Sequence, residues 1–198
     1  METTLSIVGD QLFHRIAESL NRVEMRLRKA IAILEAAGIP FAIVGGNAVR
    51  IWVAQVDPGA VRATNDVDVL IRPEDLESAI AIMERNGYRY RHSAGLDMFL
   101  EGEDDSPRSA IHVILANRPV RQDDFEPNPD VEPNQVGDGI RTLPLERLVR
   151  MKLNSYRLKD RVHLIDMIQV GLIDATWITR FPAPLADRLQ SLIENPNQ

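Results

Sequence analysis

Apolar and polar residues alternate with helical spacing over the first part of the chain. Between residues 11 and 37 the apolar positions recur every three to four residues and form one stripe, made up of Leu12, Phe13, Ile16, Leu20, Val23, Leu27, Ile31 and Leu34. Gly38 and Pro40 follow, and a glycine commonly ends a helix whereas a proline cannot continue one. The pattern therefore predicts a long amphipathic helix that ends at Gly38.

Short apolar runs then alternate with helical stretches. The runs Phe41–Val44 and Val67–Ile71 are expected to be buried strands, and further strands are expected at 88–91, 98–101 and 110–116. Helices are expected at 47–56, where Asn47 suits the N-cap, and at 73–86, where a proline suits the first turn. This alternation predicts a sheet covered by helices.

The last third of the chain has a different pattern. Residues 117–139 hold four prolines, two glycines and six acidic residues, which predicts a long loop without regular structure. A helix of about four turns is expected from Pro144, a second at 162–170, and a last amphipathic helix at Ala183–Glu194. The predicted fold class is therefore α/β (α+β), with a mixed-sheet core at 1–142 and a helical C-terminal region at 143–198 packed on it.

Composition narrows the class of protein. The 198 residues include 29 acidic and 23 basic side chains, for a net charge of −6, and no cysteine. Without cysteine the chain has no disulfides, no thiolate metal site and no cysteine nucleophile. The acidic balance argues against broad coating of nucleic acid but allows a local basic groove. No segment approaches the ~20 apolar residues of a membrane span, and no signal-peptide pattern is present, so we expect a cytoplasmic protein with no membrane partner.

Two aspartates in the second predicted strand are the strongest local anomaly. Aspartate is disfavoured in strands, yet Asp66 and Asp68 stand two residues apart at the start of a β-branched run. Strand geometry places both carboxylates on one face, about 6–7 Å apart at the backbone. Unpaired, they would repel by roughly 2–3 kcal/mol at an effective dielectric of about 20. A hard divalent cation, Mg²⁺ or Mn²⁺, would remove that cost, and the alternative is a strand whose aspartates face solvent.

A pair of glycines, Gly45 and Gly46, lies between the first predicted strand and the next helix. Glycines at this position let the backbone approach a phosphate, and the N-terminus of the helix adds free N–H groups and positive potential. A bare pair of glycines is more often an ordinary tight turn, so the pair indicates a phosphate site only together with the aspartates.

Together the two features resemble the DNA polymerase beta-like nucleotidyltransferase superfamily. The stretch that carries the resemblance is FAIVGGNAVRIWVAQVDPGAVRATNDVDVLI, residues 41–71. It is similar in particular to small bacterial nucleotidyltransferases of the AbiEii type, which are associated with toxins and antitoxins. Their signatures are matched by VGGNA at 44–48, by TNDVDVL at 64–70 and by a later Lys-bearing stretch at 145–167.

The resemblance implies a nucleotidyltransferase fold and the transfer of a nucleoside monophosphate from an NTP to an acceptor hydroxyl on RNA, a protein or a small molecule. Phosphates would bind at Gly45 and Gly46, with help from Asn47 or Arg50 by our own inference. Mg²⁺ or Mn²⁺ would bind at Asp66 and Asp68. A cognate antitoxin-like protein is a further partner that the resemblance suggests.

Basic residues concentrate at 141–163, where seven Lys or Arg stand against two acids. In this segment Lys152 is expected to reach the triphosphate, and Arg157 and Asp160 are further candidates for nucleotide binding. Lys152 and Lys159, seven residues apart, would share one helix face. RNA is a conceivable partner of this segment, and the alternative is a solvated face of paired charges.

The sequence departs from the superfamily pattern at one position: catalytic members carry a third acidic residue on a later strand, beside the first two. The matching strand, 109–116, contains no acid, and His112 is the polar side chain in its interior. His112 is thus a candidate for the third position or simply a structural histidine. Asp97, Asp104 and Asp105 are alternatives, and of these only Asp97 begins a predicted strand. The missing acid motivates a second hypothesis, a catalytically degenerate fold that binds a nucleotide or a partner without turnover.

Overall fold

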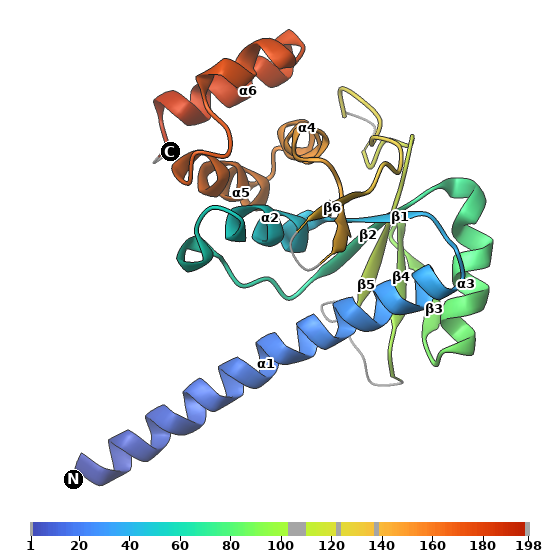
Figure 1. Ribbon diagram of the computed structural model, residues 1–198, viewed down its shortest axis with the longest axis vertical. Coiled ribbons are helices and arrows are strands. Elements are labelled where there is room, and N and C mark those ends of the chain that lie inside the picture. The colour runs from blue at the N-terminus through green and yellow to red at the C-terminus, as the bar shows by residue number, and fades with distance from the viewer. Residues whose placement is uncertain (1, 103–109, 122–123, 137–138, 197–198) are drawn as a thin grey trace.

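The fold is built around one mixed sheet with helices on both sides (Figure 1). The computed structural model describes residues 2–102, 110–121, 124–136 and 139–196. Within them the strands are β1 (Phe41–Val44), β2 (Val67–Ile71), β3 (Arg89–Ser93), β4 (Leu96–Leu100), β5 (Ile111–Leu115), β6 (Asn134–Val136) and β7 (Ile140–Thr142). The helices are α1 (Glu2–Ala36), α2 (Gly45–Ala54), α3 (Leu76–Arg85), α4 (Leu145–Ser155), α5 (Leu158–Gln169) and α6 (Ala183–Glu194). Short 3₁₀ helices cover Pro58–Ala60, Pro73–Asp75 and Ala175–Arg180.

The strands of the described residues follow the order β3-β4-β5-β2-β1-β7-β6. The pairs β2 with β5 and β1 with β7 are parallel, and the other neighbouring pairs are antiparallel. The central strand β1 is apolar and buried along its whole length, as expected for a strand covered on both faces. The predicted fold class, a mixed sheet flanked by helices, is therefore confirmed.

Strand register decides which residues share a face of the sheet. Asp68 lies opposite Val44 on one side and opposite His112 on the other, and His112 lies opposite Met98. Side chains alternate along a strand, so these four residues point to the same face. Asp97 neighbours Met98 in the chain and therefore points to the opposite face.

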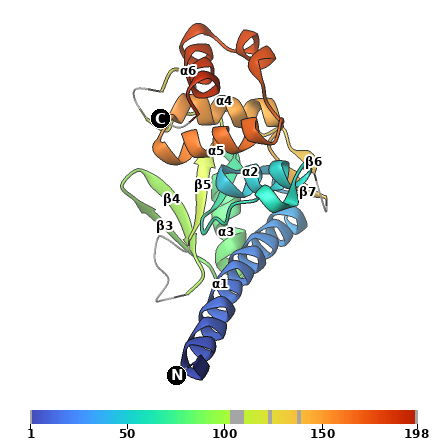
Figure 2. The ribbon, with the colours of Figure 1, turned by 90° about the vertical axis from the view of Figure 1, so that its left-hand side faces the viewer.

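Helix α1 packs against α3, β2 and β5 through its C-terminal half. Its N-terminal half extends well beyond the rest of the molecule (Figures 1 and 2). It ends as predicted, because Gly38 has a φ of +68° and the amide of Ile39 donates to the carbonyl of Leu34. The helix starts at Glu2, so the start predicted from the stripe, residue 11, was too late. None of the helices in the described ranges is both long and apolar enough to cross a membrane.

The C-terminal helices α4, α5 and α6 contact one another, and α4 and α5 also contact α2 (Figure 2). Two predictions for this half of the chain were wrong. Residues 117–139 include the short strand β6, which pairs with β7 and so needs no apolar run of its own. The helix that follows Pro144 ends at Ser155, and the next one begins at Leu158 instead of residue 162.

Candidate functional site

A sharp turn joins β1 to α2 at Gly45 and brings the backbone against a carboxylate. Gly45 has a φ of +66°, and a Cβ atom placed on it would lie 1.8 Å from Oδ2 of Asp68. Only glycine fits both the left-handed conformation and the close approach. The helix N-cap is Val44, whose side chain makes no capping hydrogen bond. Among the described residues, the turn thus presents N–H groups without a side-chain cap next to Asp68.

Asn47 does not cap this helix, so that prediction was wrong. It lies inside the first turn, fully buried, and its Nδ2 donates to the backbone carbonyl of Asp66 at 2.7 Å. This bond ties α2 to the segment that leads into β2. Asn47 therefore fixes the backbone at Asp66 from the buried side of α2.

Asp68 and His112 face each other across the parallel pair of β2 and β5. The distance from His112 Nδ1 to Asp68 Oδ1 is 3.4 Å, and both side chains are largely buried. Burial by itself raises the pKa of the Asp68 carboxyl. The hydrogen bond and charge of His112, with smaller contributions from two lysines, outweigh burial and hold that pKa below its ordinary value. Asp68 is therefore an anion at neutral pH.

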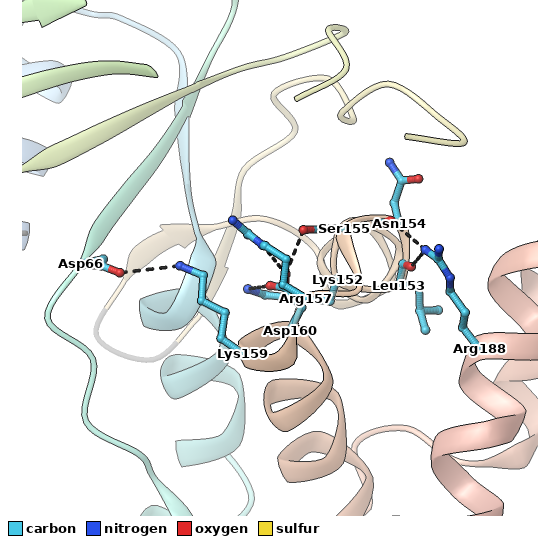
Figure 3. A network of polar contacts seen from close by, with 9 residues as sticks. All are labelled: Asp66, Lys152, Leu153, Asn154, Ser155, Arg157, Lys159, Asp160 and Arg188. Atoms are coloured by element: carbon cyan, nitrogen blue, oxygen red, sulfur yellow. Dashed lines mark hydrogen bonds and ion pairs between the residues drawn. The ribbon is translucent and has the colours of Figure 1, made fainter. Parts of the chain in front are cut away.

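Asp66 precedes β2 and is more exposed than Asp68. Its Oδ2 lies 3.7 Å from Nζ of Lys159, which reaches it from the start of α5 (Figure 3). Lys159 also belongs to the electrostatic surroundings of Asp68. Lys159 thus interacts electrostatically with both aspartates, although it lies more than 90 residues later in the chain.

Lys152 and Asp160 form a buried ion pair between α4 and α5. Lys152 Nζ donates to Asp160 Oδ1 at 2.9 Å, and the two residues are 5% and 1% exposed. Burial lowers the pKa of Lys152, and the charges of Asp160 and Asp68 oppose this effect. Burial would raise the pKa of Asp160, but Lys152 and Arg157 reverse the effect and lower it. The pair keeps a positive charge oriented close to Asp68.

Two more donors bind the second oxygen of Asp160. Ser155 Oγ and Arg157 Nε each donate to Oδ2 at 2.8 Å (Figure 3). Asp160 therefore holds both of the basic residues predicted for nucleotide binding, Lys152 and Arg157. Their spacing of five residues excludes a common face of one helix, and the chain brings them together by breaking the helix between them.

The break occurs at Tyr156, whose φ of +47° is unusual for a residue with a side chain. Arg188 of α6 donates to the carbonyls of Leu153 and Asn154 at 2.6 and 2.8 Å, which satisfies the end of α4 (Figure 3). The Arg188 guanidinium also lies over the Tyr156 ring at 4.7 Å, and the Tyr156 hydroxyl donates to the Arg188 carbonyl. The prediction that Lys152 and Lys159 share one helix face was wrong for this reason.

These groups line a cleft of about 180 Å³ between the sheet and α4 and α5. Its polar lining includes Gly45, Asp68, His112, Lys152, Arg157, Lys159 and Asp160. Its apolar lining includes Leu96, Ile114, Val120, Leu148 and Met151. Three other predicted site residues, Gly46, Asn47 and Asp66, are not part of this lining, and Gly46 lies against Thr64 and His163 on the far side of the turn.

The third carboxylate is not supplied by β4. Asp97 is buried, accepts a hydrogen bond from the Tyr90 hydroxyl and lies 2.7 Å from His92 Nδ1. It points to the face of the sheet opposite Asp68, so the alternative that placed it in the metal site was wrong. The other two alternatives, Asp104 and Asp105, lie outside the described residues. His112 occupies the strand position directly beside Asp68.

In the part of the chain that the structure describes, no group of three or more His, Asp or Glu side chains could hold a metal ion by itself. Mg²⁺ commonly binds through one or two carboxylates and takes its remaining ligands from water and substrate phosphates. Asp68 is ionised and within the cleft, and Asp66, two residues earlier, shares the neighbouring Lys159; both are oxygen donors of the kind this ion prefers. The donor set therefore fits a cation that is completed by a bound nucleotide.

Sequence reasoning missed His163 and Ser155. The Nδ1 atom of His163 is buried and makes no hydrogen bond to any described residue, and burial together with the charge of Lys152 lowers the pKa of this imidazole to about 4. Both residues lie inside the signature stretch 145–167, but its Lys, Arg and Asp residues were singled out there and these two were not. The proximity of Gly46 and Thr64 could have been predicted, because the two residues belong to the two signatures at 44–48 and 64–70.

The basic segment 141–163 is largely paired within the molecule. Arg141, Arg147 and Arg150 each form an ion pair with a glutamate. Lys152 and Arg157 share Asp160, and Lys159 approaches Asp66. The segment therefore presents fewer free positive charges than its composition indicates.

The sequence matches one nucleotidyltransferase family, and the fold is similar to solved structures. Residues 13–151 match the family described as "Uncharacterised nucleotidyltransferase". The solution structure of the antibiotic-resistance factor ANT(2'')-Ia is similar, with a TM-score of 0.51 and 16% identity over 87% of this chain and 92% of that one. An antigenic nucleotidyltransferase-like protein from Paracoccidioides brasiliensis gives a TM-score of 0.49 and 16% identity over 90% and 88% of the two chains. No curated protein matches the sequence.

At these identities the structural likeness speaks for the fold alone, whereas the family match covers more than half of the chain. The order of the motifs, strand, double glycine, helix and Asp-x-Asp strand, lies inside the matched residues. The chain belongs to this family of nucleotidyltransferases.

Proposed function

We propose that this protein transfers a nucleoside monophosphate from an NTP to an acceptor hydroxyl, with Mg²⁺ or Mn²⁺ as cofactor. The observation that carries the proposal is the convergence in one cleft of Gly45, Asp68, Lys152 and Lys159. They come from three separate segments of the chain and combine an anion, a helix N-terminus without a side-chain cap and two cations. That combination suits a metal-bound triphosphate.

The triphosphate is best placed at the turn before α2, where the amides that follow Val44 have no side-chain cap. Lys159 is half exposed and can swing from Asp66 to a phosphate oxygen. Lys152 is held in place by Asp160 and contributes a fixed positive charge. Arg157 is more exposed than Lys152 and lies at the rim, where it can contact the same ligand.

Asp68 and Asp66 would hold the cation, with the remaining ligands from water and the nucleotide. When bound, such an ion neutralises charge on the phosphates and lowers the pKa of an oxygen it contacts. The oxygen of the acceptor hydroxyl forms a bond to the α-phosphorus, and the bond from that phosphorus to its bridging oxygen breaks. Pyrophosphate leaves, and the hydroxyl proton passes to solvent. The chain contributes positioning and charge.

The test is nucleotidyl transfer by the full chain with each of the four NTPs and Mg²⁺ or Mn²⁺. Pyrophosphate release and transfer of labelled α-phosphate to RNA, protein or small hydroxyl compounds are measured separately. We expect Asp68→Asn to abolish the signal. Asp97→Asn is the matched control, because it removes a buried carboxylate from the opposite face of the same sheet. Equal activity of both variants would contradict the assignment.

A second candidate function is nucleotide binding without turnover. The absence of a third acidic ligand beside Asp68 and His112, within the described residues, favours it. It predicts calorimetric binding of an NTP that Asp68→Asn weakens, without pyrophosphate release under any condition. The variant His112→Asp places a third carboxylate beside Asp68. If this variant transfers a nucleotide and the wild-type protein does not, the site is degenerate; if neither does, the acceptor is missing from the assay.

The acceptor and partners are proposed more broadly. RNA binding by 141–163 would compete with the ion pairs of this segment, so we expect it to be weak and sensitive to salt. The AbiEii-type subgroup and an antitoxin-like partner remain predictions from the sequence signatures. Transfer of label to total RNA tests the RNA acceptor. Co-expression with the product of a neighbouring gene, followed by labelling of that product, tests the antitoxin-like partner.

A further inference from the structure

The cleft has a polar end and an apolar end. At the polar end Gly45 follows β1, whose last residue pairs with Asp68 of β2. The apolar lining of the sheet begins beyond His112, with Leu96 of β4 and Ile114 of β5. Since the strand order is β4-β5-β2-β1, the pair of Asp68 and His112 lies between the two ends.

Strand register places the apolar residues on the cleft face. Ile114 stands two residues after His112 in β5, so both side chains point to the same face. Asp97 pairs with Val113 across the antiparallel strands β4 and β5, so the preceding residue, Leu96, lies beside Ile114. An apolar surface therefore adjoins His112 on the side away from Gly45.

A loop and a helix complete this apolar wall. Val120 comes from the loop after β5, and Leu148 and Met151 come from α4. Asp124 Oδ2 accepts a hydrogen bond from the backbone amide of Val120 at 2.9 Å, which holds the loop in place. Leu96 is 41% exposed and Val120 is 50% exposed. These two side chains thus offer apolar surface to a ligand without any rearrangement of the core.

The geometry of phosphoryl transfer decides which part of the reaction uses this wall. The attacking and leaving oxygens lie roughly in line on opposite sides of the phosphorus. With the triphosphate at the turn after β1 and the α-phosphate beside Asp68, the pyrophosphate leaves on the side of Gly45. The acceptor then approaches from the side of His112 and the wall. The ribose oxygen lies off that line, so the nucleoside does not compete for this side.

The carboxylates that line the cleft already have partners. Asp124 accepts the amide of Val120, and Asp160 accepts hydrogen bonds from three side chains. Asp68 interacts with His112 and is assigned to the cation. Among the described residues of the lining, no further carboxylate is present to pair with an amino group. A cationic acceptor would therefore lose hydration without a charged partner.

We propose that the acceptor is a small uncharged alcohol whose apolar body packs on Leu96, Ile114 and Val120 while its hydroxyl lies beside Asp68. The inference rests on the proposed function and names the acceptor class for it. The hydroxyl oxygen bonds to the α-phosphorus, the bond to the bridging oxygen of pyrophosphate breaks, and the proton passes to solvent. Burial of the apolar body supplies the affinity.

The first test measures binding without turnover. Naphthylmethanol serves as a fluorescent probe on the full chain with Mg²⁺, with and without a non-hydrolysable NTP. Leu96→Ser and Val120→Ser should each weaken its binding by about threefold or more. The matched control is Val56→Ser, because Val56 is 54% exposed and does not line the cleft. Equal effects at residues 56 and 120, or displacement of the probe by the NTP, would overturn the inference, since displacement assigns the wall to the nucleobase.

The second test measures transfer of labelled α-phosphate to primary alcohols of increasing chain length. We expect kcat/KM to rise by roughly two- to fourfold per methylene in the wild-type protein, and less steeply in Leu96→Ser. Aminohexanol, which adds one charge to the length of hexanol, should be about tenfold poorer. A preference for aminohexanol or for RNA over hexanol would overturn the inference even where transfer is confirmed. Probe binding that depends on Leu96, without transfer to any acceptor, would instead contradict the proposed function and leave the apolar subsite supported.

Discussion

Gly45 and Asp68 are in contact where β1 ends beside the start of β2. A methyl group on residue 45 would lie 1.8 Å from the carboxylate oxygen. The glycine is required twice, by its φ of +66° and by this neighbour. The approach places backbone amides without a side-chain cap beside an ionised carboxylate, where a phosphate and a cation could bind side by side.

Replacement of this glycine separates the two requirements. Gly45→Ala is expected to reduce NTP affinity by about tenfold or more, because the carboxylate must move to make room. Gly38→Ala is the matched control, with a φ of +68° and no neighbour within 4 Å. It should cost only the roughly 1–2 kcal/mol of a left-handed residue and leave binding intact. Calorimetry and urea unfolding measure the two effects, and equal loss of affinity in both variants would count against the phosphate turn.

The buried pair of Lys152 and Asp160 should be strongly coupled. Lys152→Met leaves the Asp160 charge buried with one cation fewer, and we expect a loss of about 3 kcal/mol in the free energy of unfolding. Combining Lys152→Met with Asp160→Asn should cost much less than the sum of the single changes. The more exposed pair of Arg150 and Glu126, also 2.9 Å apart, is the control and should show a coupling of about 1 kcal/mol or less. Additive effects at the buried pair would refute its assignment as a unit.

His163 should make stability depend on pH between about 4 and 6.5. Its pKa is lowered in the folded protein, so below pH 6.5 the unfolded chain binds a proton that the folded chain does not accept until pH about 4. The unfolded state then binds more protons, and stability falls as the pH falls through this range. His163→Gln should flatten the dependence in urea unfolding, whereas His14→Gln, on the exposed part of α1, should not. A wild-type stability that is constant over this range would contradict the prediction.

Asp97 should control the titration of Tyr90 without affecting the cleft. The hydrogen bond to Asp97, with burial, raises the pKa of the Tyr90 hydroxyl to about 12. Asp97→Leu should lower this pKa toward its ordinary value, which is seen as more tyrosinate absorbance at pH 11. NTP binding should stay unchanged because Asp97 points away from Asp68. Loss of NTP binding with an unchanged tyrosine titration would place Asp97 in the site after all.

Much of the fold follows from local patterns. Apolar runs located the strands Phe41–Val44 and Val67–Ile71 to the residue, because burial on both faces of the sheet leaves a clear signal. A one-sided apolar stripe located the last helix equally well. The strand β6 has no such signal, since it forms only by pairing with β7. The start of α1 was missed because the apolar stripe that predicted the helix begins only at Leu12.

The candidate site was predicted as a set of residue types and corrected in its geometry. Gly45 and Asp68 come together as the motifs indicated. Asn47, placed at the helix cap by its residue type, instead supports Asp66 from within the core. Asp97 was excluded by strand register, which depends on the pairing of β4 with β5 and cannot be read from either strand alone.

The sequence by itself determined the elements that local physics controls: the double-glycine turn, the strand that carries Asp68, and the helix stripe. Only the tertiary structure decided that Lys152, Ser155 and Arg157 converge on Asp160, since this requires a left-handed Tyr156 held by Arg188 from another helix. Spacing along one helix excludes that convergence. Long-range contacts supply it because they stabilise a local conformation that the segment alone would not adopt.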